Sequence, residues 1–220
     1  MLSWLGRYQN PGTALRRFAA IKHYCAFVDS SACEGIRVPT PPPNAKQPFT
    51  KDELRRILAA CRRPQDRAMI LLALDTGLRR SELTSLSRSA IDLENGLLRV
   101  RGKGEKERIV ALGSQAVAAL RLCLDGRGYP WYSQRTHGPM TPDGFYRLCR
   151  RLSAATGIHI HPHRFRTTWA CMFVEATGDV GSAQVLMGHA KVETTLQYTG
   201  WIKQRRALEQ GRRHSLGDRL

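Results

Sequence analysis

Long apolar runs and paired cysteines are both missing from this chain of 220 residues. The longest apolar run, Ala68 to Leu74, is far too short to span a bilayer. The N-terminus lacks the successive basic, apolar and small-residue zones of a signal peptide. None of the six cysteines belongs to a C-x-x-C pair, which favours free thiols over a disulfide framework or a zinc site. We therefore expect a soluble, cytoplasmic protein with no membrane partner.

Acidic residues are also scarce, because 18 Asp and Glu stand against 35 Lys and Arg, for a net charge of +17. Such an excess predicts a polyanionic partner, and nucleic acid is the first candidate. A solvated basic surface on a ribosomal or membrane-associated protein is the competing interpretation, and charge alone does not separate the two. Arginines that could contact DNA are clustered on or beside predicted helices: Arg62, Arg63, Arg67, Arg147, Arg150 and Arg151.

The chain length predicts one main domain with a small appendage. An amphipathic helix is expected at Thr13–Phe27, with Thr13 as its cap. Five prolines follow within residues 39–49, a density that forbids regular structure and favours an extended linker. We therefore assign residues 1–38 to a short helical region, 39–49 to a Pro-rich linker and 50–220 to the main domain.

The main domain is expected to be mainly α with a small antiparallel β-sheet. It opens with a capping box, Thr50 and Glu53, ahead of apolar residues at helical spacing. Two apparent strands, 97–101 and 107–112, flank a glycine-containing hairpin turn. Further helices are predicted at Gln65–Asp75, from Arg79, after Ser114, from Pro142 to before Gly157, and near Phe165–Ala176, Val180–Met187 and Thr194–Gln210, with a frayed basic C-terminus.

Separate motifs of the main domain carry basic and phenolic side chains that together suit cutting a phosphodiester without a metal ion. Guanidinium groups can hold phosphate oxygens bidentately, and a tyrosine hydroxyl can attack phosphorus. A lysine can protonate the departing oxygen, and a histidine can shuttle protons. The candidates are Arg79 in TGLRRSEL, Lys103 in GKGEKER, His163 and Arg166 in HRFR, and His189 and Tyr198 in GHAKVETTLQY.

From about Thr50 to about Ile202, the order and separation of these motifs resemble the tyrosine recombinase family, the phage-type integrases. The resemblance implies that the protein cuts and rejoins duplex DNA through a 3′-phosphotyrosyl intermediate, in site-specific recombination or integration of a mobile element. It also implies a homo-oligomer, a tetramer, on DNA. No nucleotide cofactor and no metal ion are required, because the phosphotyrosine keeps the bond energy and cationic side chains do the work of a metal.

The resemblance also assigns roles to the six candidates. Tyr198 would be the nucleophile, which stands nine residues after His189, as in the family. Arg79, Arg166 and His189 would stabilise the charge on the phosphorane, Lys103 would protonate the 5′ oxygen, and His163 would assist proton transfer.

Ordinary structural roles compete with each assignment. Arg80 adjoins Arg79, Lys106 could replace Lys103, and a surface basic pair would explain the helical i, i+3 spacing of the HRFR motif. Glu82 matches an acidic residue that orients the family's site, but a glutamate in the first turn of a helix is also favoured by the helix dipole. His189 could be a helix C-cap and Tyr198 a half-buried helix residue.

Two departures from the family pattern are visible. Thr167 stands where many members carry a histidine after the second arginine, and only about forty residues precede the main domain, where members usually have a full DNA-clamping domain. By resemblance, residues 1–38 would be a short helical remnant of an N-terminal DNA-binding domain and residues 50–220 the catalytic domain. The chain could be a shortened integrase, or its start could be internal to a longer gene.

Beyond the candidate motifs, Trp201, Ile202 and Leu208 are apolar on an otherwise polar helix. They would pack on a neighbouring protomer by resemblance, or on their own core.

Three alternative functions remain open at this point. A type IB topoisomerase would share the chemistry but only relax DNA, and a truncated relative would bind DNA without activity. The run His159-Ile160-His161-Pro162-His163 alternates like a strand, and three imidazoles on one face could bind a metal.

Overall fold

The computed structural model describes residues 11–28, 30–34, 36, 47–102, 107–124, 126, 128–188, 195 and 199–214. The chain divides into two compact units, Met1–Ala45 and Lys46–Leu220. Of the predicted linker, only residues 47–49 fall within the described part of the chain.

The first unit contains the helix α2, Pro11–Phe27, and the short 3-10 helix η1, Ser31–Cys33. Because α2 already begins at Pro11, the prediction that Thr13 caps this helix is wrong. The side chains of Phe18, Cys25 and Cys33 form a small buried cluster, in which the two thiols are in contact with Sγ atoms 3.0 Å apart.

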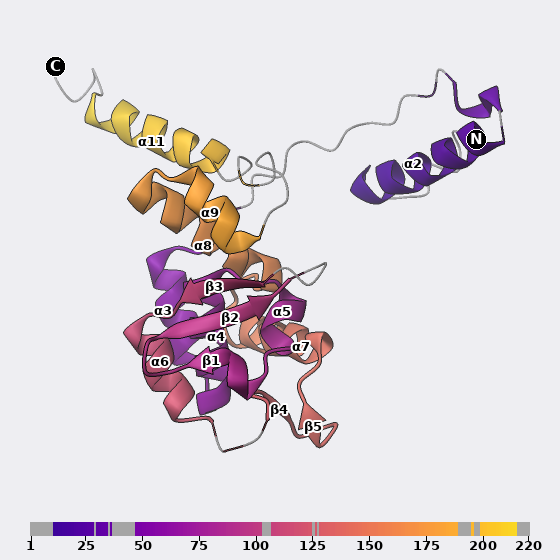
Figure 1. Cartoon of the computed structure of the whole chain (residues 1–220). Coiled ribbons are helices and arrows are strands. Elements are labelled where there is room, and N and C mark those ends of the chain that lie inside the picture. Colours follow the sequence, from indigo (N-terminus) through magenta and orange to yellow (C-terminus); the bar gives the residue numbers. More distant parts are fainter. Residues whose placement is uncertain are drawn as a thin grey trace. The chain divides into compact units, whose positions relative to one another are not determined.

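The second unit is mainly helical with small antiparallel sheets, as predicted (Figure 1). Its elements in chain order are α3 (Lys51–Ala59), α4 (Pro64–Thr76), α5 (Arg80–Thr84), η2 (Arg88–Ala90), β1 (Ile91–Asp92), β2 (Leu97–Arg101), β3 (Glu107–Ala111), α6 (Ser114–Arg121), β4 (Tyr132–Ser133), β5 (Gly138–Pro139), α7 (Pro142–Thr156), α8 (Pro162–Thr177), α9 (Val180–Met187) and α11 (Thr199–Arg213).

Local capping signals set several of the helix ends where the sequence predicts them. The amide of Glu53 donates to the hydroxyl of Thr50 at 3.1 Å, and the amide of Thr50 donates back to the Glu53 carboxylate at 2.8 Å. Gly77 and Gly157 end α4 and α7 in the left-handed conformation that glycine adopts without strain.

Other ends differ from the prediction. The helix α8 begins at Pro162, three residues before the predicted Phe165, because proline is well suited to the first helical turn. At the other end of the chain, α11 continues to Arg213 instead of ending at Gln210.

The three-stranded sheet has the order β1-β2-β3, with antiparallel pairing throughout. Leu97 pairs with Ala111 and Arg101 with Glu107, so β2 and β3 form a hairpin around residues 102–106. Leu98 and Val100 of β2 are buried, while the alternate residues Leu97, Arg99 and Arg101 face solvent.

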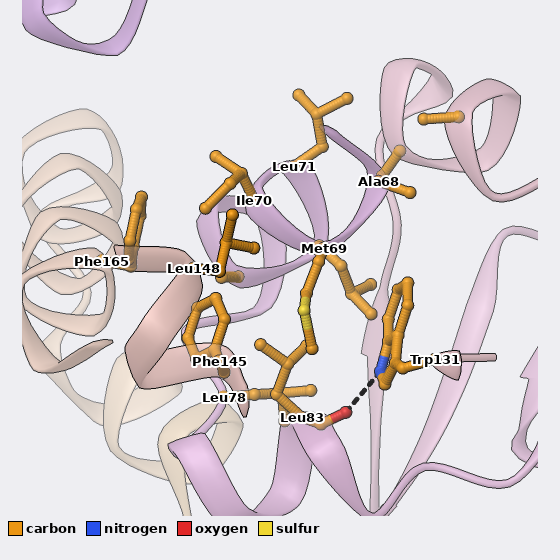
Figure 2. Close-up of a cluster of buried hydrophobic side chains, with 14 of the residues drawn as sticks. Ala68, Met69, Ile70, Leu71, Leu78, Leu83, Trp131, Phe145, Leu148 and Phe165 are labelled. Atoms are coloured by element: carbon orange, nitrogen blue, oxygen red, sulfur yellow. Dashed lines mark hydrogen bonds between the residues drawn. The ribbon is translucent and has the colours of Figure 1, made fainter. Parts of the chain in front are cut away.

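Helix α4 lies at the centre of the main core and is apolar nearly all round, as expected for a helix buried by its neighbours. Figure 2 shows its Met69 and Ile70 among side chains from α7 and α8, including Phe145 and Phe165. The indole of Trp131 is fully buried there and donates to the carbonyl of Leu83 at 2.6 Å (Figure 2).

A second cluster of buried side chains joins α8, α9 and α11, which lie side by side in Figure 1. Ile202 of α11 is only 4% exposed and Trp201 packs against the cluster, whereas Leu208 is exposed. Two of the three apolar residues of this helix therefore cover the protein's own core. Among the helices of the described part, none is long and apolar enough to cross a membrane.

Candidate active site

Arg79 lies at the turn between α4 and α5, directly before the first helical residue of α5. Its Nη1 donates to Oε1 of Glu82 at 2.9 Å, and its backbone amide donates to Oε2 at 2.8 Å. The anion at this helix start is therefore a side chain of the same turn. Arg80, the neighbouring candidate, is exposed.

Glu82 is buried, and its carboxylate is shared by Arg79 and Arg108. Arg108 of β3 donates from Nη1 and Nη2 to the two carboxylate oxygens, at 3.2 and 2.9 Å. Burial by itself would raise the pKa of Glu82, but the hydrogen bonds and charges of Arg108 and Arg79 outweigh it and lower this pKa to about 2. The carboxylate is therefore ionised at neutral pH.

Arg108 is a further residue of this site, and no sequence motif identifies it. The available signal was the two-residue period of β3, which places Arg108 on the same face as the buried Val110. An arginine on the inward face of a strand needs a buried partner, since a buried charge without one is costly. That partner is Glu82, 26 residues earlier in the chain.

Arg166 lies in α8 and is only 3% exposed. Its Nη1 donates to the carbonyl of Gly77 at 2.7 Å, and its Nη2 donates to the carbonyl of Met187 at 2.8 Å. The helix α8 packs tightly on the turn after α4: a Cβ on Gly77 of this turn would lie only 2.9 Å from the ring of Trp169 in α8. Arg166 therefore links this turn to the end of α9.

The C-terminal end of α9 receives guanidinium groups from three elements. Arg166 reaches the carbonyl of Met187, and Nη1 of Arg79 lies 3.5 Å from the same oxygen. Arg79 Nη2 donates to the carbonyl of Gly188 at 3.1 Å, and Arg108 Nε donates to the carbonyl of Leu186 at 2.7 Å. These donors satisfy the carbonyl groups that an α-helix leaves without partners at its end.

His163 occupies the first turn of α8 and is exposed, three residues before the buried Arg166. The alternative of a metal site formed by His159, His161 and His163 needs a strand that aligns the three imidazoles. That strand does not form, because residues 158–161 are irregular and Pro162 starts the helix.

His161 instead precedes the helix, and its ring lies 5.3 Å from that of His159. Within the described ranges, no group of three or more His, Cys, Asp or Glu could hold a metal ion.

Lys103, its competitor Lys106, His189 and Tyr198 lie outside the described residues. Their neighbours in the chain are described. Arg101 and Glu107, which pair at the end of β2 and the start of β3, stand on either side of residues 103–106 in the chain. Gly188, whose carbonyl accepts a hydrogen bond from Arg79, directly precedes His189. Helix α11 begins at Thr199, the residue after Tyr198.

The chain is similar to known proteins over most of its length. A model of the phage integrase family matches residues 47–205. The tyrosine recombinase XerC of Xanthomonas campestris pv. campestris (strain B100) is 33% identical over 209 residues, which cover 86% of this chain and 64% of that protein. The chain thus spans slightly less than two thirds of the length of this relative.

Solved structures show the same architecture. The crystal structure of XerA recombinase matches with a TM-score of 0.65 at 30% identity, over 88% of this chain and 72% of that one. A Tn1549 transposon integrase in complex with circular intermediate DNA matches with a TM-score of 0.72, over 89% of this chain and 79% of that one. Its identity of 22% shows a shared fold and nothing finer.

Proposed function

Because the chain belongs to the phage integrase family, we propose that it cuts and rejoins DNA strands at specific sites through a covalent 3′-phosphotyrosyl intermediate. The observation that carries the proposal is the approach of Arg79 and Arg166 to one carbonyl, that of Met187. The two guanidinium groups come from segments far apart in the sequence and approach the same oxygen, which is the convergence that binding one phosphate together would need.

The proposed reaction transfers one phosphoryl group twice. The oxygen of Tyr198 forms a bond to the phosphorus while the bond to the 5′ oxygen breaks, and Lys103 gives that oxygen its proton. Arg79, Arg166 and His189 stabilise the charge that develops on the phosphorane, and His163 assists proton transfer. Rejoining reverses these steps with a 5′ hydroxyl as the nucleophile.

The proposed partner is double-stranded DNA. The net charge of +17 suits a polyanion, and the Tn1549 integrase of the same fold was solved in complex with DNA. Exchanging both strands of two duplexes needs four cleavages, so we propose a homotetramer that supplies one Tyr198 from each protomer. We place this reaction in the cytoplasm, in keeping with six cysteines that are all free thiols.

The proposal is tested with a library of nicked duplexes whose sequence is randomised around the nick. Cleavage near the nick releases a short oligonucleotide that carries the 5′ hydroxyl needed for rejoining. The enzyme then stays covalently bound, and denaturing gels show a protein–DNA band. We expect such a band with the wild-type protein, and its loss in Tyr198→Phe with DNA binding nearly intact. The substitution removes one oxygen and leaves the basic surface unchanged.

Other outcomes identify the alternatives. Binding without any covalent band would indicate a DNA-binding relative that lacks the activity. Covalent bands and relaxation of supercoiled plasmids, without exchange between two selected duplexes, would indicate a type IB topoisomerase activity. A band that persists in Tyr198→Phe would disprove the assignment of the nucleophile.

A further inference from the structure

Arg108 connects three parts of the candidate site that are distant in sequence. Its Nη atoms bind the carboxylate of Glu82 in α5, and its Nε donates to the carbonyl of Leu186 in α9. Its guanidinium also lies against Gly188, since a Cβ on that glycine would be 3.1 Å from Nη1. One rigid planar group thus fixes both the α5 turn and the end of α9.

Both of these parts hold proposed catalytic groups. Glu82, once fixed by Arg108, binds the backbone amide and the Nη1 of Arg79. The end of α9 accepts hydrogen bonds from Arg79 and Arg166, and the chain passes from Gly188 directly into His189. A shift of Arg108 would therefore move the acceptors that orient both arginines.

Arg108 is engaged by groups of the protein at each nitrogen atom of its guanidinium. Its side chain is 11% exposed, and the hydrogen bonds above already occupy its Nε and both Nη atoms. These contacts support a role in fixing Glu82 and the end of α9, and the DNA affinities measured below test whether Arg108 also contacts DNA.

We propose that Arg108 is a positioning residue for strand cleavage, which acts by holding Glu82 and the C-terminal end of α9 so that Arg79 and Arg166 converge on the scissile phosphate. This inference rests on the proposed function. Misplacement of reacting groups by about 1 Å can cost about 10²-fold in rate. We therefore expect Arg108→Met to slow cleavage about 10- to 100-fold at saturating DNA.

The experiment measures single-turnover formation of the covalent band on a nicked duplex selected from the library above. Arg108→Met removes the charge at similar length, and Arg108→Lys keeps the charge but cannot reach Glu82 and Leu186 with a planar fork. We expect both variants to bind DNA within about twofold of wild type and to cleave slowly, Arg108→Lys less so than Arg108→Met.

A matched control comes from Arg121 on α6, which also donates to a backbone carbonyl, that of Leu93 at 3.1 Å. Arg121→Met removes the same charge at a site that does not contact Glu82, and we expect it to cleave at the wild-type rate. A comparable slowing in this control would show that loss of positive charge alone explains the effect and would overturn the inference.

The pH dependence of cleavage separates positioning through Glu82 from a general loss of structure. Arg79 and Arg108 bind Glu82, and Arg99, Arg101 and Glu107 line the same groove of about 360 Å³. Burial raises the pKa of Glu82, and the hydrogen bonds and charge of Arg108 are among the contributions that lower it. Removal of Arg108 should therefore raise this pKa. The ratio of the cleavage rate at pH 8 to that at pH 5.5 should then be larger in Arg108→Met than in wild type, and the excess should vanish in Arg108→Met with Glu82→Gln.

Each result decides for or against the positioning role. A wild-type cleavage rate in Arg108→Met or Arg108→Lys overturns it, and so does a loss of DNA affinity as large as the loss of rate, because that identifies a DNA contact. If Arg108→Met does not fold, the rate and affinity of Arg108→Lys decide alone. Absence of any covalent band with the wild-type protein would contradict the proposed function instead, so the two failures are distinguishable.

Discussion

Arg79 and Arg80 are neighbours in sequence but differ in environment. Arg79 is held by Glu82 and by the carbonyl of Gly188, whereas Arg80 is the exposed first residue of α5. We expect Arg79→Ala to slow cleavage about 10²- to 10³-fold, as loss of one charge-stabilising donor typically does. Arg80→Ala, the matched control, should have a much smaller effect on the rate of covalent-band formation. A more sensitive Arg80 would show that the register assigned to TGLRRSEL is wrong.

Glu82 gives a second prediction at the residue scale, which concerns stability. Its pKa falls from an ordinary 4.5 to about 2 on folding, so its contribution is present above pH 4.5 and is lost as the pH falls toward 2. Between pH 7 and pH 3 this amounts to about 2 kcal/mol of unfolding free energy. We expect urea unfolding to show a smaller loss of stability over this range in Glu82→Gln than in wild type. An equal loss in both proteins would contradict the bridge to Arg108 and Arg79.

At the scale of elements, the turn after α4 is the point where α8 packs. Gly77 has φ +58°, and a Cβ there would lie 2.9 Å from Trp169, whereas Gly157 has φ +70° and nothing within 4 Å of a Cβ. Gly157→Ala should therefore lower the free energy of unfolding only by the strain of an alanine in the left-handed conformation, about 1–2 kcal/mol. Gly77→Ala should cost about 1–3 kcal/mol more from overpacking, measured by urea unfolding, and should also slow cleavage by displacing Arg166. Equal losses of stability would show that α8 yields to the added methyl group.

The sequence predicts the elements better than it predicts their contacts. Capping boxes and helix-ending glycines are local signals, so the box at Thr50 and the stop at Gly77 were readable. The partners of Arg108 lie 26 and 78 residues away, and no periodicity specifies such pairings. The sequence motifs predict the candidate residues, but they do not predict that carbonyl groups of α9 hold Arg79 and Arg166, because these contacts also join distant parts of the chain.

At the scale of the whole molecule, several of the basic side chains are held in ion pairs. Arg63 and Arg151 both pair with the buried Asp66, and Arg147 pairs with Asp143. Three of the six arginines first considered for DNA contact are therefore already engaged in structural ion pairs. The net charge of +17 already includes these acidic partners, but a count of arginines overstates the phosphate contacts available, because each such pair would have to be broken or shared.

Helix α11 links the core of the second unit to the proposed assembly on DNA. Trp201 and Ile202 pack into the cluster of α8 and α9, whereas Leu208 is exposed and Arg205 pairs with Glu175 at 3.1 Å. That ion pair is half-exposed and is worth at most about 1 kcal/mol. Deletion after Lys203 keeps both core residues and removes the exposed end of the helix.

We expect the protein truncated after Lys203 to melt within a few degrees of the full chain, because its apolar contacts are retained. It should still form the covalent band on a single site, yet lose the higher-order complexes that sedimentation or gel shift detects on DNA. Arg205→Ala, which removes only the pair with Glu175, is the control for the ion pair and should assemble normally. Unfolding of the truncated protein would assign the end of α11 to the protein's own core, and unchanged complexes would show that assembly uses another surface.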